Sequence, residues 1–200
     1  MDTVTLTGNN NVLNAVLGVD ASGHSVATLN AFDSIKGAAN STGNTLNIAD
    51  SSTVAQVDVI PATLSNIQTV GLTTTDNAGS VGGPTVFDVS GLTNLTVQSA
   101  GNAGDDIKAA TTTNVTDTAS GGGGATISGG NAVTVKANGS ISVTGAAGAV
   151  AVTDAGAGPN TITVQGGTTV SAAAGAVPTP LRRGFFMLSR NGPKGQAITT

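Results

Sequence analysis

Hydrophobic and polar residues alternate in short runs along this chain, each three to six residues long. The first two runs occupy residues 4–6 and 12–16, and Gly and Asn residues separate them. Further runs, bounded by Gly, Asn, Asp, Ser or Pro, occupy residues 45–48, 54–59, 67–72, 85–89 and 95–97. Because successive side chains of a strand point to opposite faces, this period of two predicts many short β-strands.

After the glycine run at residues 121–124, which is interpreted as a flexible turn, the apolar positions recur at shorter intervals. The expected core positions in this part are Ile127, Val135, Val143, Val152, Val164 and Val170. Earlier core positions are Val57, Val59, Ile67, Val70, Val86, Val89, Leu95, Val97 and Val133. Small, uniform strands of this kind favour an all-β fold, a β-solenoid of the β-helix or β-roll type in which similar coils stack.

Two local patterns bear on this prediction. A Leu-x-Asn-apolar tetrapeptide occurs at residues 64–67 and again at 92–95, which predicts stacked coils with Asn at an inward turn. Asn138-Gly139 lies between two alternating runs, and this dipeptide is a strong signal for a hairpin. An antiparallel β-sandwich or a mixed β fold is therefore the alternative architecture.

Composition also favours strands over helices. All eleven acidic residues are Asp, which favours turns, whereas the absent Glu favours helices. Helical spacing of Leu29, Phe32 and Ile35 predicts at most one short helical turn within residues 27–39. The chain has no Cys and 2% aromatic residues, so disulfides, Cys metal sites and nucleic-acid binding are not expected. No apolar run reaches the roughly 18 residues of a membrane helix, so no membrane span is expected either.

The formal net charge of -4 is unevenly distributed. All eleven Asp lie within residues 1–181, whereas residues 182–200 hold three Arg and one Lys and no acid. The stretch before this basic segment is rich in Ala and Pro, which is typical of a linker. We therefore expect a β-solenoid domain over residues 1–171, a linker over 172–180 and a basic, disordered tail over 181–200.

Three segments resemble bacterial β-strand-repeat surface proteins. They read TLNAFDSIKG at residues 28–37, GNTLNIAD at 43–50 and PATLSNIQTV at 61–70. That family comprises surface-layer and adhesin-like chains of Gram-negative bacteria, related to type I secreted calcium-binding nonapeptide-repeat proteins. The similarity covers roughly residues 3–170, and only these segments are specific. It implies a secreted solenoidal protein that assembles on the cell surface, often with calcium.

The calcium-binding form of the nonapeptide repeat uses glycines for tight turns and Asp for charge. At residues 37–44 (GAANSTGN) Asn stands in place of the acidic ligand, and residues 156–162 (GAGPNTI) are similarly degenerate. The best match is GNAGDDI at residues 101–107, where Asp105 and Asp106 are adjacent in a Gly-bounded turn. These two carboxylates are the candidate calcium ligands, and a solvated acidic loop is the alternative.

Catalytic signals are weak. The single histidine, His24, lies between serines that nothing marks as activated, so we expect a surface histidine and no catalytic residue. Asp105 and Asp106 are the only adjacent carboxylates, and residues 1–181 nearly lack the aromatic and cationic residues of a polysaccharide-cleaving site. Thr-x-Thr pairs, as at residues 161–163, do not recur at a fixed period, which disfavours an ordered array of hydroxyl groups.

Together these patterns predict a structural, extracellular, self-associating module of the surface-layer or filament type. Stacked coils leave strand edges at the ends of a solenoid, and such edges pair readily with neighbours. Self-association into sheets or filaments is the expected partnership, with cell-surface polysaccharide as a further partner and calcium as the expected cofactor. A carbohydrate-binding or host-adhesion module is the alternative function, and a polysaccharide-acting enzyme is the third.

Overall fold

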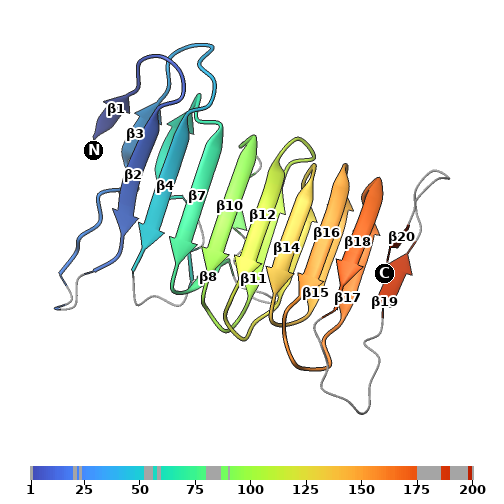
Figure 1. Ribbon diagram of the computed structural model, residues 1–200. Coiled ribbons are helices and arrows are strands. Elements are labelled where there is room, and N and C mark those ends of the chain that lie inside the picture. Colours follow the sequence, from blue (N-terminus) through green and yellow to red (C-terminus); the bar gives the residue numbers. More distant parts are fainter. Residues whose placement is uncertain are drawn as a thin grey trace.

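The computed structural model of this chain describes residues 2–19, 22, 24–51, 56–57, 60–79, 87–89, 91–174, 186–189 and 198–199. These residues form short strands joined by turns, and none of them lies in a helix. Every pairing between two of their named strands is parallel. The strands stack in chain order along one axis (Figure 1), so the predicted β-solenoid is confirmed and the antiparallel sandwich is wrong.

The longest sheet has nine strands that follow one another in the order of the sequence. They are β2 (Val12–Leu17), β4 (Thr45–Asp50), β7 (Thr69–Thr74), β10 (Asn94–Ser99), β12 (Asn114–Ala119), β14 (Val133–Ala137), β16 (Ala149–Asp154), β18 (Thr169–Ala173) and β20 (Ile198–Thr199). In Figure 1 this sheet runs from the blue N-terminal end toward the red C-terminal end. The strands predicted at residues 12–16, 45–48, 67–72 and 95–97 all belong to it.

Three smaller sheets form the other sides of the coils. They contain β1 (Thr3–Thr5), β3 (Asp33–Lys36) and β6 (Ala62–Ser65); β5 (Gln56–Val57) and β8 (Asn77–Ala78); and β9 (Phe87–Asp88), β11 (Asp105–Ala109), β13 (Ala125–Gly129), β15 (Ile141–Ala146), β17 (Ile162–Gly166) and β19 (Phe186–Ser189). From β9 onward the strands alternate strictly between this six-stranded sheet and the nine-stranded sheet. Each coil there contributes one strand to each of two sheets.

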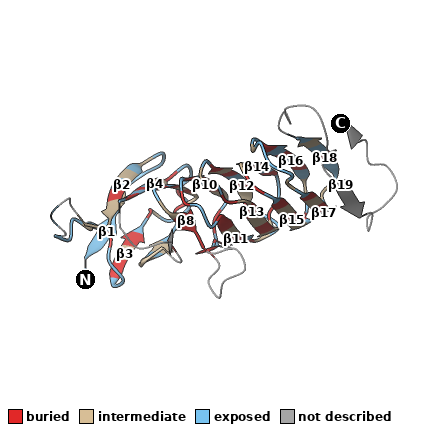
Figure 2. Cartoon of the chain, turned by 90° about the horizontal axis from the view of Figure 1, so that it is seen from below, coloured by how far each residue is buried: buried red, intermediate tan, exposed pale blue. Residues whose placement is uncertain are grey.

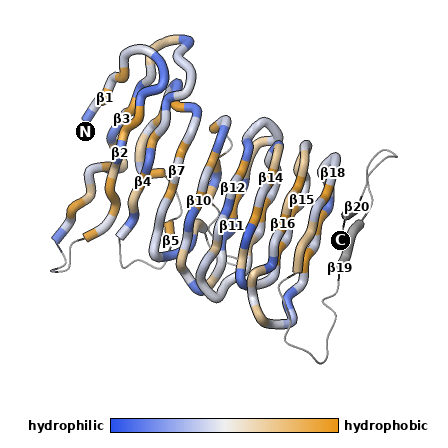
Figure 3. Tube along the Cα trace, viewed as in Figure 1, coloured by the Kyte–Doolittle hydropathy of each residue, from blue (hydrophilic) through white to orange (hydrophobic). Residues whose placement is uncertain are grey.

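The core lies between the sheets, where Figure 2 shows the buried positions. One inward row of the nine-stranded sheet consists of Leu46, Val70, Leu95, Val115, Val133, Val150 and Val170. An inward row of the six-stranded sheet consists of Phe87, Ile107, Ile127, Val143 and Val164. Figure 3 shows the corresponding alternation of apolar and polar residues along the strands. Because most of these side chains are small, stability depends on stacking many coils rather than on any single residue.

The predicted core positions fit this arrangement. Those within the described residues are all buried: Val57, Ile67, Val70, Val89, Leu95, Val97, Ile127, Val133, Val135, Val143, Val152, Val164 and Val170. Val59 and Val86 lie outside the described residues, as do residues 175–180 of the predicted linker and most of the predicted tail. Within that tail the backbones of β19 and β20 pair with β17 and β18.

Asparagine side chains link successive coils beside the nine-stranded sheet. Asn131 Nδ2 donates to Asn114 Oδ1, and Asn114 Nδ2 donates to Asn94 Oδ1, each at 3.0 Å. Asn94 Nδ2 donates in turn to Thr69 Oγ1 at 3.4 Å. Stacked amides satisfy one another's polar groups along an array of parallel strands, so this ladder holds the coils in register.

Three local expectations differ from the structure. Asn138-Gly139 connects β14 to β15, which belong to different sheets, so it forms a corner of the coil and no hairpin. Asn66 is exposed with a φ of 54°, whereas Asn94 begins β10, so the two Leu-x-Asn segments are not equivalent and neither Asn is buried. Phe32 is exposed, and the residues directly after it form the strand β3 and no helical turn. Pairing of β3 with β1 and β6 outweighs the helical spacing of the apolar residues.

The glycine run at residues 121–124 is a closely packed corner, in contrast to the flexible turn expected. A Cβ atom on Gly124 would lie 1.9 Å from the backbone oxygen of Ser140 in the next coil. Only glycine allows the two backbones to approach this closely. Gly122 is less confined, because a Cβ atom there would meet the side-chain oxygen of Asn102 at 3.3 Å.

Candidate functional site

Asp105 and Asp106, the predicted calcium ligands, are neighbours on β11, and their side chains lie on opposite faces of it. Asp105 points into the core and is fully buried, whereas Asp106 is half-buried on the outer side. Alternation along a strand imposes this separation. The structure therefore does not bring the two carboxylates together around one ion. In the described part of the chain, no group of three or more His, Cys, Asp or Glu side chains is placed to hold a metal.

The Asp105 carboxylate accepts two hydrogen bonds inside the fold. The backbone N–H of Ala78 donates to Oδ1 at 2.7 Å, and Ser99 Oγ donates to Oδ2 at 2.6 Å. Burial raises the pKa of Asp105, and these two donors oppose that shift. A carboxyl group in this position has no access to a polymer outside the fold.

Asp117 on β12 also points into the core and is only 1% exposed. It interrupts an inward row that otherwise consists of Ile48, Leu72, Val97, Val135 and Val152. Among the described residues no N–H or O–H group donates to either Asp117 oxygen. Burial, followed by the charge of Asp105, raises the pKa of Asp117 well above its usual value. Asp117 is not among the predicted site residues, although its place between Val115 and Ala119 in an alternating run marks it as inward.

Two further acids have pKa values that shift in opposite directions. Burial, with the charge of Asp50 as a second cause, raises the pKa of Asp76. Hydrogen bonds from the backbone N–H groups of Asp2 and Asn30, at 2.9 and 2.8 Å, lower the pKa of Asp33. The stability contributions of these acids in the N-terminal coil and in the middle coils therefore change with pH in opposite directions.

The turn that contains His24 lies at the surface. His24, Ser22 and Ser25 are all exposed, and Ser25 forms an isolated antiparallel bridge with Val19. The expectation of a surface histidine is confirmed.

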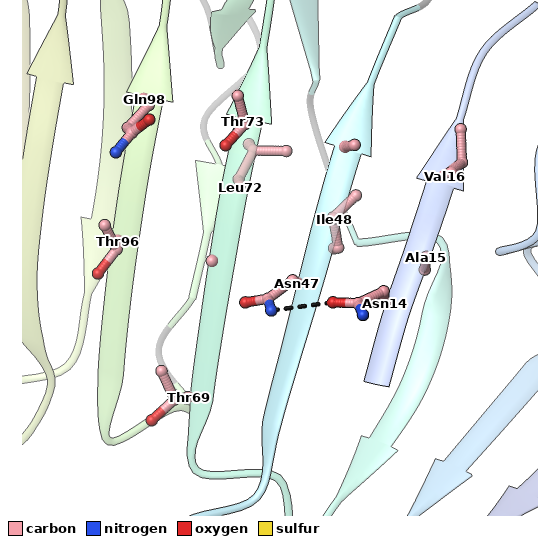
Figure 4. A pocket seen from close by; sticks show the side chains of 12 residues that line it. Asn14, Ala15, Val16, Asn47, Ile48, Thr69, Leu72, Thr73, Thr96 and Gln98 are labelled. Atoms are coloured by element: carbon pink, nitrogen blue, oxygen red, sulfur yellow. Dashed lines mark hydrogen bonds between the residues drawn. The ribbon is translucent and has the colours of Figure 1, made fainter. Parts of the chain in front are cut away.

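A shallow groove of about 550 Å³ crosses the outer face of the nine-stranded sheet from β2 to β10 (Figure 4). Two rows of outward residues line it: Asn14, Asn47, Gly71 and Thr96, and beside them Val16, Ala49, Thr73 and Gln98. Gly71 and Ala49 stand within these rows, and their missing or short side chains create the hollow. The groove was not predictable from the sequence, because its residues come from four strands that lie far apart in the chain.

The groove is polar without being charged. Asn47 Nδ2 donates to Asn14 Oδ1 at 3.0 Å between β4 and β2, as the dashed line in Figure 4 shows. Thr73, Thr96 and Gln98 add hydroxyl and amide groups on the other side (Figure 4), and no lining residue is charged. Neutral donors and acceptors over a floor of small residues suit an uncharged polar ligand.

A second hollow of about 400 Å³ adjoins this groove. The two linings share Val16, Ala49, Thr73 and Gln98. The second one also includes Asp50 at the end of β4. The concave surface therefore continues along the strands toward their C-terminal ends.

Threonines line up beyond the groove on the same outer face. Thr96, Thr116 and Thr134 occupy paired positions on β10, β12 and β14, and all three are exposed. Because the coils differ in length, the three residues are unevenly spaced in the chain. These hydroxyl groups therefore form an ordered row, although the sequence shows no fixed period for them.

The strand β2 forms one edge of the nine-stranded sheet. Thr45 N donates to Asn11 O and Ser51 N donates to Leu17 O, so the odd-numbered residues here bond to β4. In a parallel ladder the alternate residues bond to the other side. The even-numbered residues of β2 therefore present their backbone groups to the open edge.

Thr28 covers part of this edge. Its backbone N–H donates to Val16 O, and Val16 N donates to Thr28 Oγ1, both at 2.9 Å. Within the described residues, no partner meets the backbone groups that Val12 and Asn14 present to the edge. The described part of the chain therefore leaves the first half of β2 as an uncovered strand edge.

These features define the class of the protein as a parallel β-solenoid with a partly uncovered edge and a neutral groove. The described residues include no helix that is long and apolar enough to cross a membrane. No protein family model matches the chain, and comparisons with curated proteins and with solved structures also give no match.

Proposed function

We propose that this chain is a structural, extracellular module that associates with copies of itself into filaments or sheets of the surface-layer type. The observation that carries the proposal is the uncovered backbone of Val12 and Asn14 on the edge strand β2. A parallel strand edge of this kind is a template for one further strand. The location outside the cell rests on the resemblance to bacterial surface proteins.

End-to-end stacking is the geometry that this edge favours. All named strands are parallel and ordered along one axis, so a strand added at β2 continues an existing ladder. Contact between the two different ends of a solenoid is heterologous, and heterologous contacts that do not close generate filaments.

A proline at the edge tests this proposal. Val12→Pro removes an N–H group that faces the open edge and leaves the bonds to β4 in place, because Val12 is an even-numbered residue at the start of β2. We expect wild type to form oligomers in sedimentation velocity and filaments or sheets in negative-stain electron microscopy, and Val12→Pro to remain monomeric. Val12→Ala, which keeps the N–H group, is the matched control. A wild-type chain that stays monomeric at high concentration contradicts the proposal.

Carbohydrate binding is the second candidate function, and the neutral groove favours it. The Asn14 and Asn47 amides, with Thr96 and Gln98, supply donors and acceptors of the kind that bind sugar hydroxyl groups. The groove is open along the strands, which suits a chain-like ligand such as a cell-surface polysaccharide.

Filling the groove tests this second function. In Gly71→Val a β-branched side chain occupies the hollow, and the nearest atom to its Cβ is the Asn47 side-chain oxygen at 3.0 Å, which can move. We expect wild type to bind neutral glycans on an array and Gly71→Val to lose that binding. Thr134→Val, on the same face outside the groove, should bind as wild type does. Equal binding by Gly71→Val and wild type would place the glycan elsewhere.

A further inference from the structure

The middle of the solenoid core contains two carboxyl groups that point inward. Asp105 on β11 has 0% exposure and Asp117 on β12 has 1%. Ser99, which donates to Asp105, lies two residues from Val97 on β10, and Val97 pairs with Asp117. Two ionised carboxylates in contact repel each other, and their burial away from water makes this repulsion strong. A buried carboxylate without a hydrogen-bond donor is also costly, and a proton on one of the two groups removes that cost.

The surroundings of the two groups decide which of them carries that proton. Asp105 accepts hydrogen bonds from Ala78 N and Ser99 Oγ, and both donors stabilise a negative charge on it. Asp117 receives no hydrogen bond from any N–H or O–H group of the described residues. We propose that Asp117 is a neutral carboxylic acid at physiological pH, which donates its proton to ionised Asp105, so that the pair is a proton-binding, pH-sensitive site in the core.

The other charged groups on the neighbouring elements do not neutralise this pair. Lys108 on β11 and Lys136 on β14 are exposed on the outer faces, and Asp106 is also on the outer side of β11. Asp76 lies before β8 and Asp50 at the end of β4, and both are acids. In the part of the chain that the structure describes, no cationic group therefore faces the two carboxyls, and a proton is what remains to balance their charge.

The sign of the pH dependence follows from linkage. The folded chain holds the proton on Asp117 at pH values where the unfolded chain has released it, since an unfolded Asp ionises near about pH 4. Stability from this site is complete below that value and is lost as the pH rises through the raised pKa of the pair. The protein should therefore be more stable in mildly acidic than in alkaline solution.

Carbon-13 NMR of the wild-type chain, labelled at the Asp carboxyl carbons, tests the proposal directly. We expect the Asp117 signal to keep the chemical shift of a protonated carboxyl at neutral pH, while the signal of exposed Asp88 is that of a carboxylate. An Asp117 signal that titrates together with exposed aspartates overturns the proposal. This measurement needs no variant and does not depend on assembly.

Thermal melts of matched variants give a second test. Asp117→Asn places an amide donor opposite Asp105 and mimics the protonated acid, whereas the control Asp88→Asn changes a carboxylate on the outer face. We expect the wild-type melting temperature to be about 5 °C higher at about pH 5 than at about pH 8. Asp88→Asn should show the same difference, whereas Asp117→Asn should lose most of it. A difference that survives in Asp117→Asn overturns the proposal. So does a rise in wild-type melting temperature with calcium at about pH 8 that Asp117→Asn abolishes, because a cation would then occupy the site.

Discussion

Thr28 covers the backbone of Val16 at the edge of β2, with one hydrogen bond to the carbonyl and one from the N–H group. A residue that occupies an edge donor and an edge acceptor in this way limits uncontrolled strand addition. Among the described residues the cover ends before Asn14, so one half of the edge is closed and the other half has no partner there. Under the proposed self-association, such an edge favours contact at a defined register over general aggregation.

Removing this cover should increase association. Thr28→Val keeps the size of the side chain but deletes the Oγ1 acceptor, which leaves the Val16 N–H exposed at the edge. We expect a larger oligomer fraction than in wild type at equal concentration, measured by sedimentation velocity. Thr118→Val, on β12 within the sheet, is the control and should sediment as wild type does. A smaller oligomer fraction in Thr28→Val would show that Thr28 supports the contact between copies instead of limiting it.

The glycine corner provides a matched pair of stability variants. Gly124→Ala places a methyl group 1.9 Å from Ser140 O, so the two coils must move apart, at a cost of about 1–3 kcal/mol in the free energy of unfolding. Gly122→Ala, in the same run, has 3.3 Å to a side-chain oxygen and should be nearly neutral. Urea unfolding of both variants gives the comparison. Equal stability of the two would show that this corner is loosely packed.

The asparagine ladder stabilises the fold through polar side chains, so we expect the replacement of one of them to destabilise it. Asn114 donates to Asn94 Oδ1, and its own Oδ1 accepts from Asn131 Nδ2 and from Ala132 N. Asn114→Ala removes these bonds and leaves its neighbours without partners, so we expect a loss of about 1–3 kcal/mol in the free energy of unfolding.

Thr116→Ala is the control for the ladder, because Thr116 lies on the same strand with an exposed side chain. It should unfold at nearly the wild-type urea concentration. If the ladder does not stabilise the fold, Asn114→Ala and the control will instead have the same urea midpoint of unfolding.

Alternation made the strands and the core predictable from the sequence, because inward and outward positions differ in polarity at every strand. Val133 and Val135 illustrate this, since both were expected in the core and both are 1% exposed. The pairing partners were not predictable in the same way. Thr96 pairs with Thr116 and Thr116 with Thr134, and the unequal coil lengths between them leave no period to detect.

The candidate site was less predictable than the fold for a related reason. Adjacency in sequence suggested that Asp105 and Asp106 act together, whereas alternation sends them to opposite faces. The carboxyl whose charge acts on Asp117 is that of Asp105, and the turn between β11 and β12 lets both strands direct these residues into the core. The groove depends likewise on register, because Gly71 creates a hollow only between Asn47 and Thr96.

Chelation tests the expectation that Asp105 and Asp106 hold calcium. Because these side chains lie on opposite faces and both Asp105 oxygens already accept hydrogen bonds, we expect equal melting temperatures with calcium and with EDTA. Asp106→Asn is the matched variant, since it removes the outer carboxylate and leaves the core unchanged. A calcium-dependent rise in melting temperature that Asp106→Asn abolishes would establish the site and contradict this expectation.

Asp33 should stabilise the N-terminal coil with the opposite pH dependence to the core pair. The backbone N–H groups of Asp2 and Asn30 bond to its carboxylate and lower its pKa, so the folded chain releases this proton more readily than the unfolded chain. The stabilisation is present above the pKa of unfolded Asp, about 3.9, and is lost as the pH falls through the lowered folded value. Asp33→Asn should therefore melt below wild type at about pH 7, and the two melting temperatures should converge in strong acid. Asp88→Asn, which alters an outer-face carboxylate, is the control. A difference in melting temperature between Asp33→Asn and wild type that persists in strong acid would show that the charge of Asp33 is not what stabilises the coil.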